Sequence, residues 1–168
     1  IMANIGKHLV ETLAIAIVYI ATAQFGFMAA TAPGNVTVVW PPSGIALAAM
    51  LLLGYRAWAG VWLGSFLVNV LFFIFHDTLV PTAVTAASSI AAGSTLQAFL
   101  AAFLYRRMIG LGIPHELKGV FNFMTLATLS CLVAPTVGMR SLVFSSATAW
   151  TDYTDTWLTW WLRDVVGI

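Results

Sequence analysis

The sequence predicts an all-α fold, a polytopic bundle of helices embedded in a membrane. Of its 168 residues, 61% are hydrophobic and only 8% are charged, and the mean hydropathy is +0.95. Soluble domains carry roughly 25% charged residues, so this composition lies far outside that class. The few charges separate apolar stretches, most of which approach the ~20 residues that a helix needs to cross a bilayer. The net charge of +1 gives no basic footprint, so we expect no nucleic-acid partner.

We expect about six transmembrane segments within a single membrane-embedded domain that covers residues 1–168. The expected ranges are about 8–30, 40–53, 57–75, 80–104 and 119–138, followed by a segment that begins near residue 156. The second is short, and the sixth is truncated at Ile168, because about thirteen residues give roughly 20 Å of helix against a ~30 Å core. We therefore expect the chain to be the front part of a larger protein.

Loop charges predict the orientation of these segments. If the segments alternate, most of the basic side chains fall on one side, namely Lys7, Arg56, Arg106, Arg107 and Lys118. The opposite side holds Asp77, Asp152 and Asp155, and Arg140 is the one possible exception. Cytoplasmic loops carry the excess of Lys and Arg, so the amino terminus is predicted to be cytoplasmic.

The short second segment opens with Trp40-Pro41-Pro42-Ser43-Gly44 in the middle of charge-free sequence. Proline is favoured in the first turn of a helix, so the two prolines predict a helix start. If Arg56 marks the cytoplasmic edge, Pro42 lies ~21 Å above it, or roughly 9 Å below the outer surface of the core. The helix is therefore expected to begin within the bilayer, where irregular backbone must be buried in protein or line a cavity.

Asp164 reaches a similar depth in the sixth segment, about 12 Å if that segment starts near Thr156. Ionised groups at such depth usually face a cavity or a partner. We expect Asp164 to lie near residues 42–44, with Arg163 or Arg140 as its counter-charge. Two interpretations stay open and are compatible: a structural ion pair that locks two helices together, and a ligand or proton site.

Other residues complete the expected site and bundle. Trp40 and Trp161 are predicted to flank the cavity, and Asn69 is a further candidate for ligand binding. Asn69 and Gln97 are expected mainly to join helices by side-chain hydrogen bonds. Two sets of small residues predict close helix packing, either inside the bundle or at a dimer seam: Gly60 and Gly64, and Ala87 and Ala91.

The sequence contains no phosphate loop, zinc motif or nucleophile elbow. Its three histidines show no metal-ligand spacing, so we expect no metal, no cofactor and no catalytic residue in this chain. Aromatic and apolar lining of the expected cavity suggests a small, partly hydrophobic ligand.

Four stretches together resemble a known family. They are WPPSGIALA at 40–48, LLLGYR at 51–56, WLGSFLVN at 62–69 and WWLRDVVGI at 160–168. In this order they resemble the MASE1 membrane-associated sensor domain of bacteria, whose late segment reads Trp-Trp-x-Gly-Asp. Arg163 stands where that pattern more usually has glycine, which alters the surroundings expected for Asp164.

The resemblance implies a multi-pass input domain of a bacterial inner-membrane signalling protein. It would regulate a cytoplasmic histidine kinase of a two-component system, or a cyclic-di-GMP enzyme, that is absent from this chain. The implied partners are the lipid bilayer, an unknown small molecule or membrane protein, and a second copy through the full-length protein. The competing prediction is a small-solute transporter or transport subunit, because broken helices and a buried carboxylate fit it equally well. A purely structural assembly subunit is third.

Overall fold

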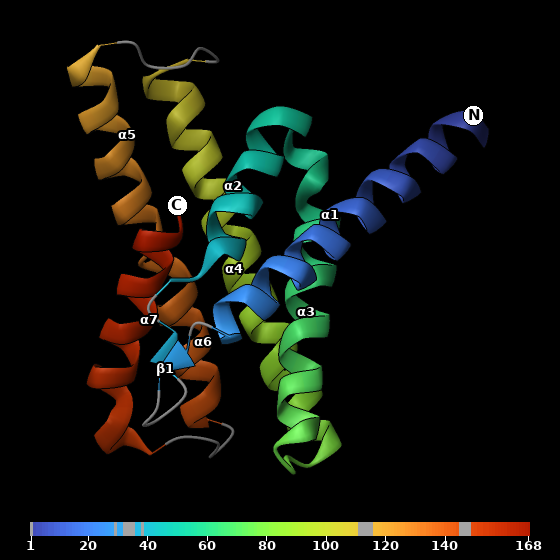
Figure 1. Cartoon of the computed structure of the whole chain (residues 1–168), viewed down its shortest axis with the longest axis vertical. Helices are drawn as coiled ribbons and strands as arrows, with labels where there is room; N and C mark the ends of the chain where they lie inside the picture. The colour runs from blue at the N-terminus through green and yellow to red at the C-terminus, as the bar shows by residue number, and fades with distance from the viewer. Residues whose placement is uncertain (1, 29, 32–35, 38, 111–115, 145–148) are drawn as a thin grey trace.

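The computed structural model describes residues 2–28, 30–31, 36–37, 39–110, 116–144 and 149–168 (Figure 1). The α-helices of these residues are α1 (Met2–Met28), α2 (Pro41–Leu53), α3 (Trp58–Phe75), α4 (Val80–Met108), α5 (Leu117–Ser130), α6 (Val133–Phe144) and α7 (Tyr153–Gly167). Short 3-10 turns precede α3 and α7: η1 (Tyr55–Ala57) and η2 (Trp150–Asp152). Strands β1 (Ala30–Thr31) and β2 (Val36–Thr37) form a small antiparallel hairpin between α1 and α2.

The helical membrane fold is confirmed, but the count of six segments is not. Among the described residues, four stretches are long and apolar enough to cross a membrane: Ile5–Met28, Tyr55–Phe75, Val80–Met108 and Leu117–Phe144. Helix α2 is apolar but has only 13 residues, and α7 has 15. Both are shorter than the ~20 residues of a full crossing.

The fourth of these stretches differs from the segment expected at 119–138, because it is longer and broken. Helix α5 ends at Ser130, and α6 begins at Val133, after a turn at Cys131 and Leu132. Pro135 lies in the first turn of α6, where its missing N–H removes no helical hydrogen bond. Because α6 continues to Phe144, Arg140 lies on an exposed part of this helix and not in the connection where it was expected.

Small residues bring α3 against α1. A Cβ atom on Gly60 would come within 2.6 Å of Ile15, and one on Gly64 within 2.7 Å of Tyr19. On α4, Ala87 and Ala91 are completely buried. All four residues therefore pack inside this chain, which is the first of the two predicted alternatives, packing within the bundle or at a dimer seam.

Helix α2 begins near mid-height in the bundle and is fixed at its far end by α4 (Figure 1). Its first residue is Pro41, as the sequence predicted, and it ends at Leu53, before Gly54, whose φ of +83° suits glycine. Arg106 Nη2 donates to the carbonyl oxygens of Met50 and Leu51 at 2.9 and 3.0 Å. A cation at this position satisfies free carbonyls and complements the helix dipole.

Candidate functional site

The start of α2 contacts α7 directly through backbone and hydroxyl groups. The Trp40 N–H donates to the Arg163 carbonyl oxygen at 3.0 Å. Ser43 Oγ lies 2.8 Å from the carbonyl oxygen of Trp40 and 3.0 Å from that of Asp164, so its proton can be donated to either. We call this contact, made by residues 40–44 with Arg163, Asp164 and Gly167, the α2–α7 junction. It joins segments more than a hundred residues apart in the sequence.

Two glycines let the backbones at the junction touch. A side chain on Gly44 would collide with the carbonyl oxygen of Gly167. A side chain on Gly167 would in turn collide with the carbonyl oxygen of Trp40. The junction is thus a close backbone contact, and any added atom there has to separate α2 from α7.

Asp164 lies inside this junction with only 2% of its surface exposed. Its Oδ2 accepts a hydrogen bond from Gln97 Nε2 at 3.3 Å, and Gln97 Oε1 accepts one from the Ala134 N–H at 3.2 Å. Gln97 of α4 therefore connects α7 to the first turn of α6, whose N–H groups lack helical partners. Oδ1 of Asp164 has no hydrogen-bond partner among the described residues.

The prediction that Asp164 lies near residues 42–44 agrees with this geometry, and Arg163, one of the two expected counter-charges, acts on the carboxylate electrostatically without forming a direct ion pair. Within the described part of the chain, Asp164 forms no ion pair within 4.0 Å, and the ion pairs found involve Glu11. Arg140 lies exposed on α6. Arg163 leaves the helix about 100° away from its neighbour and points elsewhere. One hydrogen bond from Gln97, and no direct ion pair, holds this carboxylate within the described part of the chain.

Arg163 is held between two tryptophans. Its guanidinium carbon lies 4.9 Å from the centroids of both the Trp40 and the Trp160 rings, a distance at which cation–π attraction operates. Gly138 of α6 makes room for the Trp160 ring, since a Cβ there would collide with it. The Arg163 Nε is buried and has no hydrogen-bond partner among the described residues.

Beside the junction lies a cavity of about 220 Å³, which we call the Arg163 cavity. Its aromatic walls are Phe27, Trp40, Phe72, Phe73 and Trp160. Its polar lining is Tyr19, Asn69, Ser94, Thr156 and Arg163. These residues come from the C-terminal halves of α1 and α3, the residue before α2, the N-terminal half of α4 and the first and middle turns of α7. The cavity therefore belongs to one end of the bundle.

The residues predicted for the site do not all lie together in the structure. Trp40, Ser43, Gly44, Arg163 and Asp164 come together at the junction. Pro41 and Pro42 form the first turn of α2 without lining the cavity. Asn69 lines it and donates to the Ser65 carbonyl oxygen at 2.8 Å.

Trp161 does not flank the cavity as predicted. Its Nε1 donates to the Thr128 carbonyl oxygen of α5 at 3.1 Å, and the neighbouring Trp160 occupies the cavity wall. Adjacent helical residues point about 100° apart, so only one of the two rings can face the cavity.

Gln97 joins helices by side-chain hydrogen bonds, as the sequence predicted. Sequence reasoning missed Tyr19, which is only 2% exposed in the middle of apolar helix α1. A polar side chain deep in such a helix is the signal that could have found it.

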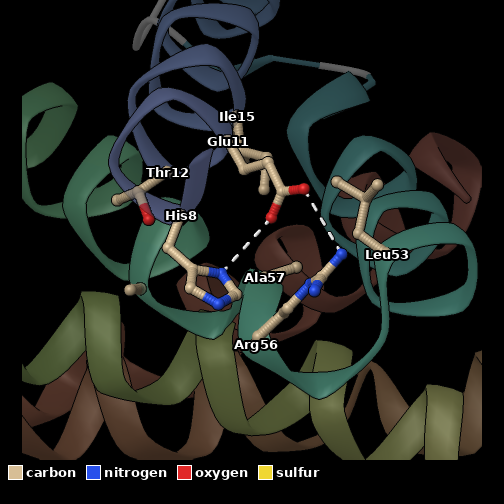
Figure 2. A pocket seen from close by; sticks show the side chains of 8 residues that line it. His8, Glu11, Thr12, Ile15, Leu53, Arg56 and Ala57 are labelled. Atoms are coloured by element: carbon tan, nitrogen blue, oxygen red, sulfur yellow. Dashed lines mark hydrogen bonds and ion pairs between the residues drawn. The ribbon is translucent and has the colours of Figure 1, made fainter. Parts of the chain in front are cut away.

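A second pocket, of about 260 Å³, lies where α1 meets the turn between α2 and α3. Figure 2 shows Glu11 between His8 and Arg56; its carboxylate oxygens lie 3.3 Å from Arg56 Nη2 and 3.6 Å from His8 Nδ1. These half-exposed charges already pair with one another, and such surface pairs contribute little stability. This pocket is a weaker candidate than the Arg163 cavity.

A comparison of the sequence with protein-family models found a match to a known family. The MASE1 model matches residues 12–168, nearly the whole chain. The chain belongs to the MASE1 family. MASE1 domains are membrane-associated sensor domains, in keeping with the apolar helices described above. The MASE1 match includes both sides of the α2–α7 junction and the whole lining of the Arg163 cavity. Searches of curated proteins and of solved structures returned no match.

Proposed function

We propose that this chain is the transmembrane input domain of a bacterial signalling protein and regulates a cytoplasmic output domain, either a histidine kinase or a cyclic-di-GMP enzyme. The single observation that carries the proposal is the α2–α7 junction beside a cavity, in a chain of a sensor family. A cavity that touches both helices of a junction gives a ligand the means to change their contact. The full-length protein would act as a homodimer.

The same proposal includes six crossings of the inner membrane with a cytoplasmic amino terminus. In Figure 1 the amino terminus, the end of α2, the end of α4 and the start of α5 all lie toward the top. The basic residues near these points support a cytoplasmic assignment for this end. Helix α7 runs toward it from the opposite end, so a change at the junction would be carried in the direction of the output domain.

Signalling would follow from a shift between two arrangements of α7 against α2. A ligand can bias such an equilibrium only by binding one arrangement better than the other. Trp40 and Arg163 would couple a ligand to this equilibrium, because each lines the cavity and also belongs to the junction. A ligand that moved either side chain would strain the hydrogen bond between their backbones.

Replacing Trp40 in the full-length protein tests this proposal. Trp40→Ala is expected to change the basal or stimulated output several-fold at equal membrane abundance, because it removes one wall of the cavity at the junction. Trp58→Ala is the matched control, since Trp58 is 54% exposed at the start of α3. Output that responds to neither substitution would contradict the proposal. Solute flux through the purified protein in liposomes would instead support the transport alternative.

A further inference from the structure

We propose that the Arg163 cavity binds a small carboxylate with an aromatic or apolar body. This inference rests on the proposed function, because it names the chemistry that the input domain would detect. In the proposed topology, the ligand would reach the cavity from the side opposite the cytoplasm.

Arg163 is the one charged side chain among the residues that line the cavity. No carboxylate of the described residues lies within 4.0 Å of it, and its buried Nε has no hydrogen-bond partner there. The adjacent Asp164 carboxylate is occupied with Gln97 on another side of α7. The charge of Asp164 acts on Arg163 from beyond ion-pair distance, so a carboxylate in contact with the guanidinium would add the bonded anion that the described residues do not supply.

The two tryptophans prepare Arg163 for a carboxylate. Because Trp40 and Trp160 lie over the guanidinium at 4.9 Å each, the edge that carries its N–H donors is the part left for a ligand. Two parallel N–H donors on such an edge match the two oxygens of a carboxylate. A phosphate with two negative charges favours more cations than one, and the lining holds one arginine and no lysine.

The rest of the lining fits an aromatic or apolar body. Phe27 stacks on Phe72 at 5.6 Å and meets the edge of Trp40 at 5.3 Å, which gives a continuous aromatic wall. Tyr19, Asn69 and Ser94 add a few groups able to form hydrogen bonds. The volume of about 220 Å³ equals that of about seven waters at ~30 Å³ each, which admits a small metabolite and excludes a whole lipid.

Phenylacetate is a suitable probe, and phenylacetamide is its uncharged match. The chain in phosphatidylcholine nanodiscs should show a saturable change in tryptophan fluorescence and a higher unfolding temperature with phenylacetate. Phenylacetamide should bind at least tenfold more weakly. Equal binding of the two compounds, or binding of neither, would overturn the proposal.

Variants locate the site. Arg163→Gln should abolish the response to phenylacetate, whereas Arg140→Gln, which removes the same charge from an exposed position, should keep it. Ser94→Leu fills the cavity without touching the charge, and it should also abolish the response. If Arg163→Gln does not fold, Ser94→Leu alone tests whether phenylacetate binds in the Arg163 cavity. A response that survives both folded variants would place the binding elsewhere and overturn the proposal.

An anionic lipid headgroup shares the carboxylate's charge and is the competing source. Nanodiscs that contain phosphatidylglycerol distinguish the two. An Arg163-dependent fluorescence change caused by this lipid alone would make the headgroup the occupant and overturn the proposal, whereas undiminished phenylacetate binding in these discs would support it. Binding is measured without any output domain. A failed binding test with a signalling effect of Trp40→Ala intact therefore refutes this inference alone.

Discussion

Asp164 shows how a charged residue is accommodated in an apolar bundle without an ion pair. Gln97 donates to Oδ2, Ser43 contacts the backbone oxygen, and one carboxylate oxygen stays without a partner among the described residues. Gln97 is itself shared with the first turn of α6. One amide side chain therefore links α4, α6 and α7 at the point where α2 begins.

Removing that amide should destabilise the bundle. Gln97→Leu leaves Asp164 Oδ2 and the Ala134 N–H without their partners, and each buried unsatisfied group costs about 1–3 kcal/mol. We expect a loss of about 2–4 kcal/mol in the free energy of unfolding, measured in detergent by chemical denaturation. Gln24→Leu is the control, because Gln24 is exposed on α1 and its replacement should change stability by less than about 0.5 kcal/mol. Equal effects of the two substitutions would contradict this account of Gln97.

At the scale of single residues, the sequence predicted well how deep a residue lies along its helix, but it did not predict which way the side chain points. The rise of 1.5 Å per residue was enough to bring Asp164 to the level of residues 42–44. It carried no information on rotation about the helix axis. The prediction therefore chose Trp161 for the cavity, where the structure has Trp160.

Among the elements, α2 is distinctive because it is short and fixed at both ends. Arg106 holds its last turn to α4, and the α2–α7 junction holds its first turn. Its two prolines and Gly54 made its start and end predictable from the sequence. Its contact with α7 depends on the absence of side chains at Gly44 and Gly167.

A methyl group at the junction should separate these two helices. Gly44→Ala places its Cβ against the Gly167 carbonyl oxygen, so it is expected to break the hydrogen bond from Trp40 to Arg163 and to change output in the full-length protein. Gly6→Ala is the control, because no atom lies within 4 Å of a Cβ there. Output measured at equal membrane abundance checks the prediction, and a Gly44→Ala protein that behaves like the control would refute it.

Two elements escaped prediction for physical reasons. The break between α5 and α6 lies at Cys131 and Leu132, inside apolar sequence whose one sign of a new helix is Pro135, because a proline can lie in the first turn of a helix as well as near the end of one. The hairpin of β1 and β2 has only two residues in each strand, too few for a recognisable alternation of apolar and polar residues.

On the scale of the whole molecule, composition was enough for the membrane class and the helical bundle. The number of crossings was harder, because only four stretches of the described residues have full length and α2 and α7 are short. Helices α2 and α7 contact each other at the α2–α7 junction in the interior of the bundle, and no single stretch of sequence shows this contact.

Cysteine labelling tests the proposed topology. Cys131 is the only cysteine and is completely buried, so new cysteines can be introduced without removing it. Asp77→Cys is expected to react with a membrane-impermeant maleimide in intact cells, because the connection between α3 and α4 lies outside in the proposed orientation. Lys118→Cys should react only after the membrane is opened. The reverse pattern would invert the orientation and move the Arg163 cavity to the cytoplasmic side.

If the α2–α7 junction transmits the signal, exchanging the carboxylate of Asp164 should change the output. The measurement is the output of the full-length protein carrying Asp164→Asn, compared with Asp155→Asn on an exposed turn of the same helix, at equal membrane abundance. A shift of about 1 kcal/mol between two arrangements alters their ratio roughly fivefold. The account predicts a change of this size for Asp164→Asn and none for Asp155→Asn. Wild-type output from a folded Asp164→Asn protein would contradict it.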